Sequence, residues 1–410
     1  MTMPKIPLSL KPLKILVLCD INNGGEWIAT LRLIKEIRNT IYPPTFFLIA
    51  FQHAQTENRF PCFEKVVLIP YAKYNPPVSF FKKLISNFSR IRSALNLPFI
   101  KKNHFDVILT TNYLFVLPIL FNNHLKKIPL VYFFHGIRSL PSLNWKNINY
   151  REILIKILER ISLLLSSVII VPSDSGKKYI STMLGPAAKY KNIRIIPNFV
   201  PVHFMEKLSP SVLRKYKQKL NIPLNYKIIL YSSRLAQFKG LENLLSAFQL
   251  FSRFSPKTIL ILAYPNQKQD ELYVKSIINT IRIMKLEDKI SLIADSSIKQ
   301  LKALYQMADL SILPSELEIN PLVMLESLAC GTPFIGTDTG NIKEVLSNIS
   351  EVLILINNKP ETIYKKIKEF FSLTKKGVEN IKRESVATAR SFNSHIAVSK
   401  FCSLLSELTK

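Results

Sequence analysis

The sequence predicts an α/β protein made of two doubly wound domains, each a parallel sheet with helices on both faces. Three observations support this fold class. The chain has 410 residues, more than a single core usually organises. Short apolar runs typical of buried strands alternate with amphipathic segments of helical periodicity. That alternation restarts after residues 197–201, so we place the hinge between two domains near residues 198–206.

The first domain is expected to cover residues 1–200. Residues 13–19 form the first predicted strand, and a helix at 27–38 follows a Gly24-Gly25-Glu26 turn. Six later strands are predicted at 46–50, 66–69, 107–109, 130–134, 168–171 and 193–196. The longest apolar run is roughly half of what crosses a bilayer, and the N-terminus does not resemble a signal peptide. We therefore expect a cytoplasmic protein, either soluble or bound to a membrane surface.

The second domain is expected to cover residues 201–386. A helix at 212–220 precedes a strand at 227–231, a turn at 232–240 and a helix at 241–254. Later strands are predicted at 258–262, 290–293, 310–313, 333–336 and 352–356. The final segment, 387–410, has a helical pattern and follows the completed second sheet.

Positive charge is concentrated in the first domain. The formal net charge is +28, and between Lys65 and Arg151 the only acidic residue is Asp106. The basic residues of that span are Lys65, Lys73, Lys82, Lys83, Arg90, Arg92, Lys101, Lys102, Lys126, Lys127, Arg138, Lys146 and Arg151.

Within this basic span, residues 80–95 predict an amphipathic helix, with apolar positions at spacings of three and four. Such a helix can lie on an anionic membrane surface, or it can pack normally and present a solvated basic face. We weigh these two interpretations equally. Nucleic acid is not an expected partner, because no nucleic-acid-binding motif accompanies the charge.

Cysteine and histidine usage gives no sign of a metal site or a disulfide framework. The four cysteines contain no C-x-x-C pair and lie far apart at Cys19, Cys62, Cys330 and Cys402. This spacing suits a reducing compartment. The six histidines are equally dispersed, and we expect no metal and no cofactor.

Two carboxylates stand eight positions apart across a strand–loop–helix segment. The apolar run ending at Pro314 predicts a buried strand, and Pro321 is expected as the first residue of the following helix. Glu318 then lies in the loop at the carboxyl end of the strand, and Glu326 about one turn into the helix. In an open α/β sheet this edge binds ligands, so the carboxylates could hold sugar and ribose hydroxyls. The alternative is an ordinary loop with surface acids.

Arg234 and Lys239 lie in the turn 232–240, between a predicted strand and a helix. Two cations beside a helix N-terminus can bind a diphosphate, because arginine offers a fork of donors and lysine a point charge. A departing nucleoside diphosphate gains negative charge, which these cations would stabilise. Surface basic residues in a loop are the alternative.

The first domain offers a glycine turn and a histidine. Gly24 and Gly25 would let the backbone approach a bound group at a helix N-terminus, although the segment lacks the G-x-G-x-x-G pattern of a dinucleotide site. His135 ends the predicted strand 130–134 and could donate to a sugar hydroxyl. A plain tight turn and a structural histidine are the alternatives.

Taken together, these segments resemble the retaining GT-B glycosyltransferases of the glycosyl group 1 (family 4-like) class. The spacing of Glu318 and Glu326 is similar to the family's E-x7-E segment, and residues 232–240 are similar to its G-R-L-x-x-x-K-G element, with Ser233 where glycine is usual. Residues 339–344, Gly24-Gly25-Glu26 and the His135-Gly136 pair match further family elements. The likeness covers nearly the whole chain and is specific from 232 to 344.

The resemblance implies a GT-B fold, in which two Rossmann-like domains face each other across a cleft. The first domain would bind the acceptor and the second the nucleotide-sugar donor, with 387–410 packing back on the first. It also implies metal-independent transfer of a sugar to an acceptor hydroxyl with retention of configuration. A glycan or lipid-linked acceptor, in bacterial-type surface polysaccharide or glycolipid assembly, would fit this chemistry.

The resemblance also assigns roles to the candidate residues. His135, Arg234, Lys239 and Glu318 would be catalytic. Donor binding would involve Gly24, Gly25, Asn320, Leu322 and Glu326. In this assignment Glu326 holds the ribose and Glu318 contacts the transferred sugar, while backbone amides between them meet sugar and phosphates.

One departure bears on the donor site. Ile319-Asn320-Pro321 replaces the family's glycine-phenylalanine-glycine, and Pro321 has no N–H to donate. The side-chain amide of Asn320 could compensate. Two alternative functions therefore remain: a GT-B hydrolase or epimerase acting on a nucleotide sugar, and a non-catalytic binding protein of the same fold.

Overall fold

The computed structural model describes residues 12–21, 25–40, 42–52, 60–70, 80–136, 150–266 and 270–410. The chain divides into two compact units. The first unit consists of Met1–Pro197 with Ser394–Lys410, and the second of Asn198–Asn393. Among the described helices, none is both long and apolar enough to cross a membrane.

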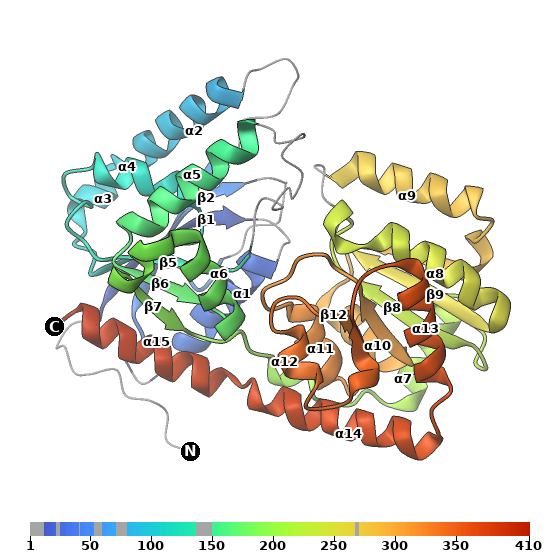
Figure 1. Cartoon of the computed structure of the whole chain (residues 1–410). Helices are drawn as coiled ribbons and strands as arrows, with labels where there is room; N and C mark the ends of the chain where they lie inside the picture. The colour runs from blue at the N-terminus through green and yellow to red at the C-terminus, as the bar shows by residue number, and fades with distance from the viewer. Residues whose placement is uncertain are drawn as a thin grey trace. The chain divides into compact units, whose positions relative to one another are not determined.

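The first unit is built on a seven-stranded sheet in the order β3-β2-β1-β4-β5-β6-β7, with all neighbours parallel (Figure 1). Strand β1 lies inside the sheet between β2 and β4. Its residues Ile15 to Cys19 are fully buried, as is typical of a parallel strand covered on both faces. The strands are β1 (Lys14–Ile21), β2 (Thr45–Gln52), β3 (Lys65–Pro70), β4 (Val107–Thr110), β5 (Leu130–Phe133), β6 (Val168–Val171) and β7 (Asn192–Ile195).

Helices flank this sheet, and the last helix of the chain belongs to the same unit. Helix α15 (Ser394–Leu408) packs on α1, and an ion pair of 2.6 Å between Arg194 of β7 and Glu407 ties it to the sheet edge. The other described helices are α1 (Gly25–Ile37), α2 (Phe80–Leu95), α3 (Pro98–Lys102), η1 (Tyr113–Phe115), α4 (Val116–Leu120), α5 (Tyr150–Leu165), α6 (Asp174–Leu184) and η3 (Gly185–Tyr190).

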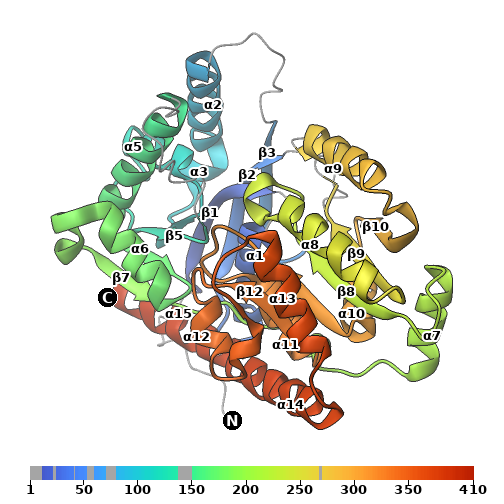
Figure 2. The same cartoon turned by 45° about the vertical axis from the view of Figure 1, so that its right-hand side comes forward.

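The second unit repeats the architecture with a six-stranded sheet in the order β10-β9-β8-β11-β12-β13 (Figure 2). All neighbours are again parallel. Its strands are β8 (Lys227–Ser232), β9 (Thr258–Tyr264), β10 (Ile290–Ala294), β11 (Leu310–Leu313), β12 (Phe334–Thr337) and β13 (Ile354–Leu355). Parallel strands buried on both faces are near-continuous apolar runs, as in Ile228–Tyr231.

The helices of the second unit enclose this apolar core on both faces of the sheet. They are η4 (Val202–Phe204), α7 (Pro210–Lys219), η5 (Gln237–Lys239), α8 (Leu241–Phe254), α9 (Glu271–Ile283), η7 (Glu287–Lys289), α10 (Ile298–Met307), α11 (Leu322–Ala329), α12 (Ile342–Leu346), η8 (Glu351–Leu353), α13 (Pro360–Phe371) and α14 (Lys375–Ser391).

Three sequence predictions need correction. The segment 387–410 is not one helix, because α14 ends at Ser391 and α15 begins at Ser394. The break falls where the carbonyl of Phe392 accepts a hydrogen bond from Val200 N at 3.0 Å instead of continuing the helical ladder. The strand expected at 352–356 is confined to two residues, since Ser350 caps a 3₁₀ turn before it.

The third correction concerns Pro321. It is the N-cap of α11, with φ −70° and ψ 122°, and not the first helical residue. The helix therefore begins at Leu322, and the extended ψ of the proline turns the chain from the preceding loop into the helix.

Candidate functional site

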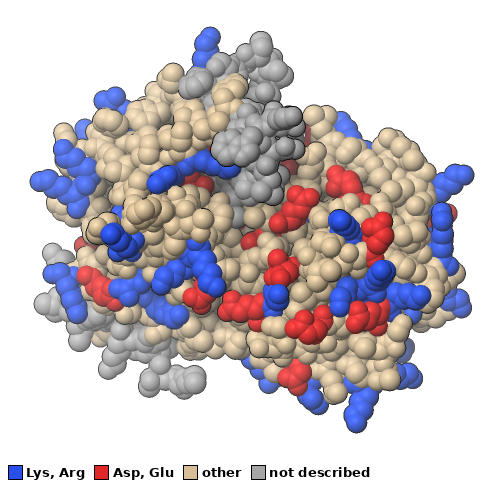
Figure 3. All heavy atoms as spheres, viewed as in Figure 1, with Lys and Arg blue, Asp and Glu red and all other residues tan. Residues whose placement is uncertain are grey.

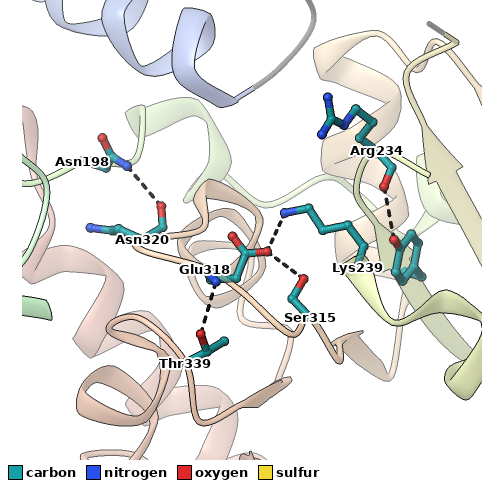
Figure 4. Close-up of polar contacts among 8 residues, drawn as sticks. Asn198, Arg234, Lys239, Ser315, Glu318, Asn320 and Thr339 are labelled. Carbon is teal, nitrogen blue, oxygen red and sulfur yellow. Dashed lines mark hydrogen bonds and ion pairs between the residues drawn. The ribbon is translucent and has the colours of Figure 1, made fainter. Parts of the chain in front are cut away.

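The carboxyl ends of β8, β11 and β12 lie side by side at one edge of the second sheet. The loops that follow these strands, 233–240, 314–321 and 338–341, therefore converge there (Figure 4). They carry most of the residues that the sequence singled out.

Lys239 and Glu318 form the centre of this edge. The Nζ of Lys239 lies 2.6 Å from Oε1 of Glu318, and the two side chains are only 15% and 10% exposed. The Ser315 hydroxyl donates to the same carboxylate oxygen at 2.8 Å, as Figure 4 shows. The backbone N–H of Glu318 donates to the Thr339 hydroxyl at 3.2 Å. A charged pair is thus held in fixed geometry where solvent is largely excluded.

Two glycines bring the loops into contact. Gly240 has φ 70° at the start of α8, and a Cβ there would overlap the carbonyl oxygen of Pro314. Gly340 has φ 60°, and its Cβ would lie 2.6 Å from the carbonyl oxygen of Glu318. Both positions combine a left-handed backbone with a close approach of two chains, which only glycine allows.

Arg234 contacts an acid that sequence reasoning missed. Its Nε lies 3.7 Å from Oδ2 of Asp270, whose side chain is 13% exposed. Burial raises the pKa of Asp270 above its ordinary value, and the nearby Arg234 partly offsets the rise. The Arg234 guanidinium and the Lys239 ammonium lie 5.5 Å and 5.1 Å from the centre of the Phe238 ring.

No sequence signal marked Asp270. It stands just before α9, distant along the chain from Arg234, and it meets the arginine because β8 and β9 are neighbours in the sheet.

Glu326 lies in α11 and is 4% exposed. The hydroxyl of Tyr305 donates to its Oε2 at 3.3 Å. Burial, and next the charge of Glu326, hold the pKa of Tyr305 well above its ordinary value, so this hydroxyl stays a donor. The sequence predicts Glu326 about one turn into the helix, and it is the fifth residue of α11, which begins at Leu322.

Asn320 and Leu322 border the start of α11. Asn320 is buried, and its backbone carbonyl accepts a hydrogen bond from the side-chain amide of Asn198 at 3.2 Å. Leu322 is the first residue of the helix, where backbone N–H groups lack intrahelical partners. Anions are favoured at such a helix end.

The first unit places His135 against α1. The Nε2 of His135 lies 3.0 Å from the Thr30 hydroxyl, which donates its hydrogen to the carbonyl of Glu26 at 2.9 Å. Which of the two groups donates in the His135–Thr30 hydrogen bond depends on the imidazole tautomer. His135 is thus joined to the first turn of the helix that begins at Gly25.

The structure therefore gathers the predicted residues into two groups. The second unit brings together Arg234, Lys239, Glu318, Asn320, Leu322 and Glu326, and the first unit brings His135 beside the helix of Gly25 and Glu26. Gly24 lies outside the described residues. The residues that the structure describes contain no group of three or more His, Cys, Asp or Glu suited to a metal ion. The four cysteines are free and buried.

Two family models match successive parts of the chain. Residues 24–204 match the model described as Glycosyltransferase Family 4, and residues 213–385 match Glycosyl transferases group 1. Together they extend across both units.

Curated relatives match over shorter segments. The N-acetyl-alpha-D-glucosaminyl L-malate synthase of Bacillus anthracis is 27% identical over 38% of this chain and 39% of its own length. The lipopolysaccharide 1,2-N-acetylglucosaminetransferase of Salmonella typhimurium is 28% identical over 44% of this chain and 47% of its own. The matches thus span less than half the length of these two relatives.

Solved structures match over nearly the whole chain. HepE of Anabaena, in complex with UDP and glucose, superposes with a TM-score of 0.72 at 17% identity, covering 96% of this chain and 98% of that one. Sucrose-phosphate synthase of Thermosynechococcus elongatus gives 0.76 at 16% identity, covering 97% and 99%. At these identities the likeness concerns the fold, which is GT-B. With this fold and the two family models in succession, the chain belongs to the group 1 glycosyltransferases.

Proposed function

We propose that this protein transfers a sugar from a nucleotide-sugar donor to an acceptor hydroxyl. The observation that carries the proposal is the edge of the second sheet. There Lys239, Arg234 and the N-terminus of α11 offer positive charge beside the fixed carboxylate of Glu318. Such an arrangement suits a diphosphate next to a polyhydroxyl group.

In this proposal the cations bind the diphosphate and stabilise the charge that it gains on departure. The diphosphate would replace Glu318 as the partner of Lys239, and Asp270 as the partner of Arg234. Glu318 would then accept from hydroxyls of the transferred sugar, and Glu326 from the ribose. Asn320 and the backbone N–H of Leu322 would bind the phosphates and the sugar.

The first unit would bind the acceptor and contact the donor sugar. We assign His135, which hydrogen-bonds to Thr30 of α1, to a hydroxyl of the sugar, and we assign Gly24 and Gly25 to donor binding. Residues 1–200 would form the acceptor-side domain and residues 201–386 the donor-side domain.

We further propose that transfer retains the anomeric configuration and uses no metal. Arg234 and Lys239 supply the charge that a metal would otherwise provide. Retention would follow if the acceptor attacks the face from which the diphosphate departs.

The acceptor would be a glycan or a lipid-linked glycan in surface polysaccharide or glycolipid assembly. This reaction would take place on the cytoplasmic face of an anionic membrane.

The test incubates the protein with a panel of UDP-, GDP- and ADP-sugars, with and without pooled glycan and lipid-linked acceptors. Turnover is measured as release of the nucleoside diphosphate. We expect one donor to turn over in the presence of an acceptor, and Lys239→Ala and Glu318→Ala to abolish this. Matched controls are Lys382→Ala and Glu379→Ala, which remove an exposed ion pair of 3.0 Å on α14 and should leave turnover unchanged. Equal turnover without any acceptor would contradict transfer and favour hydrolysis.

A further inference from the structure

The outer face of α5 carries an apolar stripe that the proposed transfer chemistry does not explain. Large apolar side chains are exposed along four turns of this helix: Tyr150, Ile153, Ile157, Ile161, Leu164 and Leu165. Ile153 and Ile157 are almost half exposed, at 46% and 49%. Their spacing of three and four places most of them on one side of the helix. A contiguous apolar face of this kind marks an interaction surface.

An apolar pocket of about 220 Å³ adjoins this helix. It is lined by Leu84, Ile85 and Phe88 of α2, by Leu114 and Leu117 near α4, and by Leu158 of α5. Ile85 is also 67% exposed, so apolar surface extends from the pocket to the outside of α2. Exposed Phe121 packs edge-on against Phe88, with ring centres 6.0 Å apart, and widens this surface.

The stripe and the pocket form one surface. Leu158 follows Ile157, and successive residues of a helix are about 100° apart round its axis. The apolar arc of α5 therefore continues from its outer side to the side that lines the pocket.

The charges beside this surface are mainly positive, although α5 also carries the half-buried Glu152. Lys82 and Arg92 on α2 and Arg160 on α5 are exposed, whereas Glu159 of α5 is buried at 1% exposure. In Figure 3, Lys and Arg side chains border the tan surface over α2 and α5, while Asp and Glu side chains gather mainly over the second unit. An occupant should therefore combine negative charge with apolar bulk. A second copy of this chain would bring the same cations against these and be repelled.

We propose that this surface, the outer face of α5 with the pocket beside α2, docks on an anionic phospholipid bilayer. The isoleucine and leucine side chains would enter the acyl boundary, the cations would contact the phosphates, and one acyl chain would occupy the pocket. The proposal rests on the proposed function where that places the acceptor at a membrane. It assigns the contact to α5 and to the outward-facing side chains of α2, because Ile91 and Leu95 of α2 are packed inward.

The test is co-sedimentation of the full chain with vesicles of phosphatidylcholine, with and without phosphatidylglycerol. The variant Ile157→Ser/Ile161→Ser removes two outer side chains. The control Leu224→Ser/Ile283→Ser removes two exposed side chains of the second unit, at 63% and 73% exposure. We expect the wild type and the control to bind vesicles containing phosphatidylglycerol, more weakly as salt rises. We expect the α5 variant to bind at least about tenfold more weakly.

Three results would overturn the proposal. They are no binding of the wild type, equal binding of the α5 variant, and a dimer in sedimentation that the α5 variant dissociates. Nucleoside diphosphate affinity, measured on the same proteins, separates the two claims. If the protein binds the nucleoside diphosphate but not the vesicles, only the proposed docking surface is wrong. If the wild type does not bind the nucleoside diphosphate, the proposed donor site is contradicted. Unchanged thermal unfolding midpoints would confirm that the substitutions leave the fold intact.

Discussion

At the scale of single residues, the candidate site rests on two cations already paired with carboxylates. Lys239 is bound to Glu318 at 2.6 Å, and Arg234 lies 3.7 Å from Asp270. The sequence predicted the first three of these residues from their position after predicted strands. It could not predict Asp270, Thr339 or Tyr305 as partners, because the order of strands in the sheet brings these residues to the site. Ser315 meets Glu318 within one loop, through the local fold of that loop.

The amide variant Glu318→Gln should separate donor binding from transfer. Without the carboxylate, Lys239 has no anionic competitor for the diphosphate, so nucleoside diphosphate affinity should rise or stay equal. Turnover should fall by about 10²-fold or more, because the anionic acceptor for the sugar hydroxyls is lost. Calorimetric binding and steady-state rates on the same preparation test this, and a parallel loss of both would contradict separate roles.

Asp270 should make stability depend on pH in a defined direction. Its pKa in the folded protein is raised above the ordinary 3.8, so the folded state favours the protonated form. Stability that is present below pH 3.8 is then lost as pH rises through the raised pKa.

The variant Asp270→Asn lacks this titration. Urea unfolding at pH 3, 5 and 7 should show that the variant gains free energy of unfolding relative to the wild type as pH rises. A difference that is constant with pH, or that changes in the opposite direction, would contradict the raised pKa.

At the scale of elements, the sequence predicted most of the two sheets, because parallel strands buried on both faces are short apolar runs. The expected bounds coincide with those of β6, β11 and α8. The failures are instructive. An apolar run does not distinguish the 3₁₀ turn η8 from strand β13, and the break at Phe392 depends on a hydrogen bond to Val200, distant in sequence. The close approach at Gly240 likewise needs two loops in contact.

Gly240→Ala should separate the loops that follow β8 and β11. The new Cβ would meet the Pro314 carbonyl in addition to adopting φ 70°. Loss of stability of about 1–3 kcal/mol is expected, together with loss of nucleoside diphosphate binding.

Gly185→Ala is the matched control for this substitution. Its φ is 60°, but a Cβ there meets no atom within 4 Å, and it lies in the first unit. This control should lose stability and keep diphosphate affinity. Unimpaired diphosphate binding by Gly240→Ala would contradict the claim that loop contact shapes the site.

At the scale of the whole molecule, the chain has a net charge of +28 and divides into two units. The candidate ligand of the first unit is an anionic membrane, and that of the second is a nucleoside diphosphate. The basic stretch of the first domain was evident in the sequence. The exposed stripe on α5 was not, because periodicity does not tell which apolar face of a helix is covered.

Hydrogen exchange should therefore respond to the two ligands in different places. A nucleoside diphosphate should slow exchange in the loops 232–240 and 314–321, and anionic vesicles should slow it in α5. Protection of α5 by the nucleoside diphosphate alone, or of the two loops by vesicles alone, would contradict this separation.

The central claim is that Lys239, in its setting beside Glu318, binds the diphosphate of the donor. Calorimetric titration of the wild type, Lys239→Ala and Lys382→Ala with UDP, GDP and ADP tests it most directly. We predict that the wild type binds at least one of the three, that Lys239→Ala weakens this by about tenfold or more, and that Lys382→Ala binds as the wild type does. Binding of none of them, or equal binding by Lys239→Ala, would contradict the account.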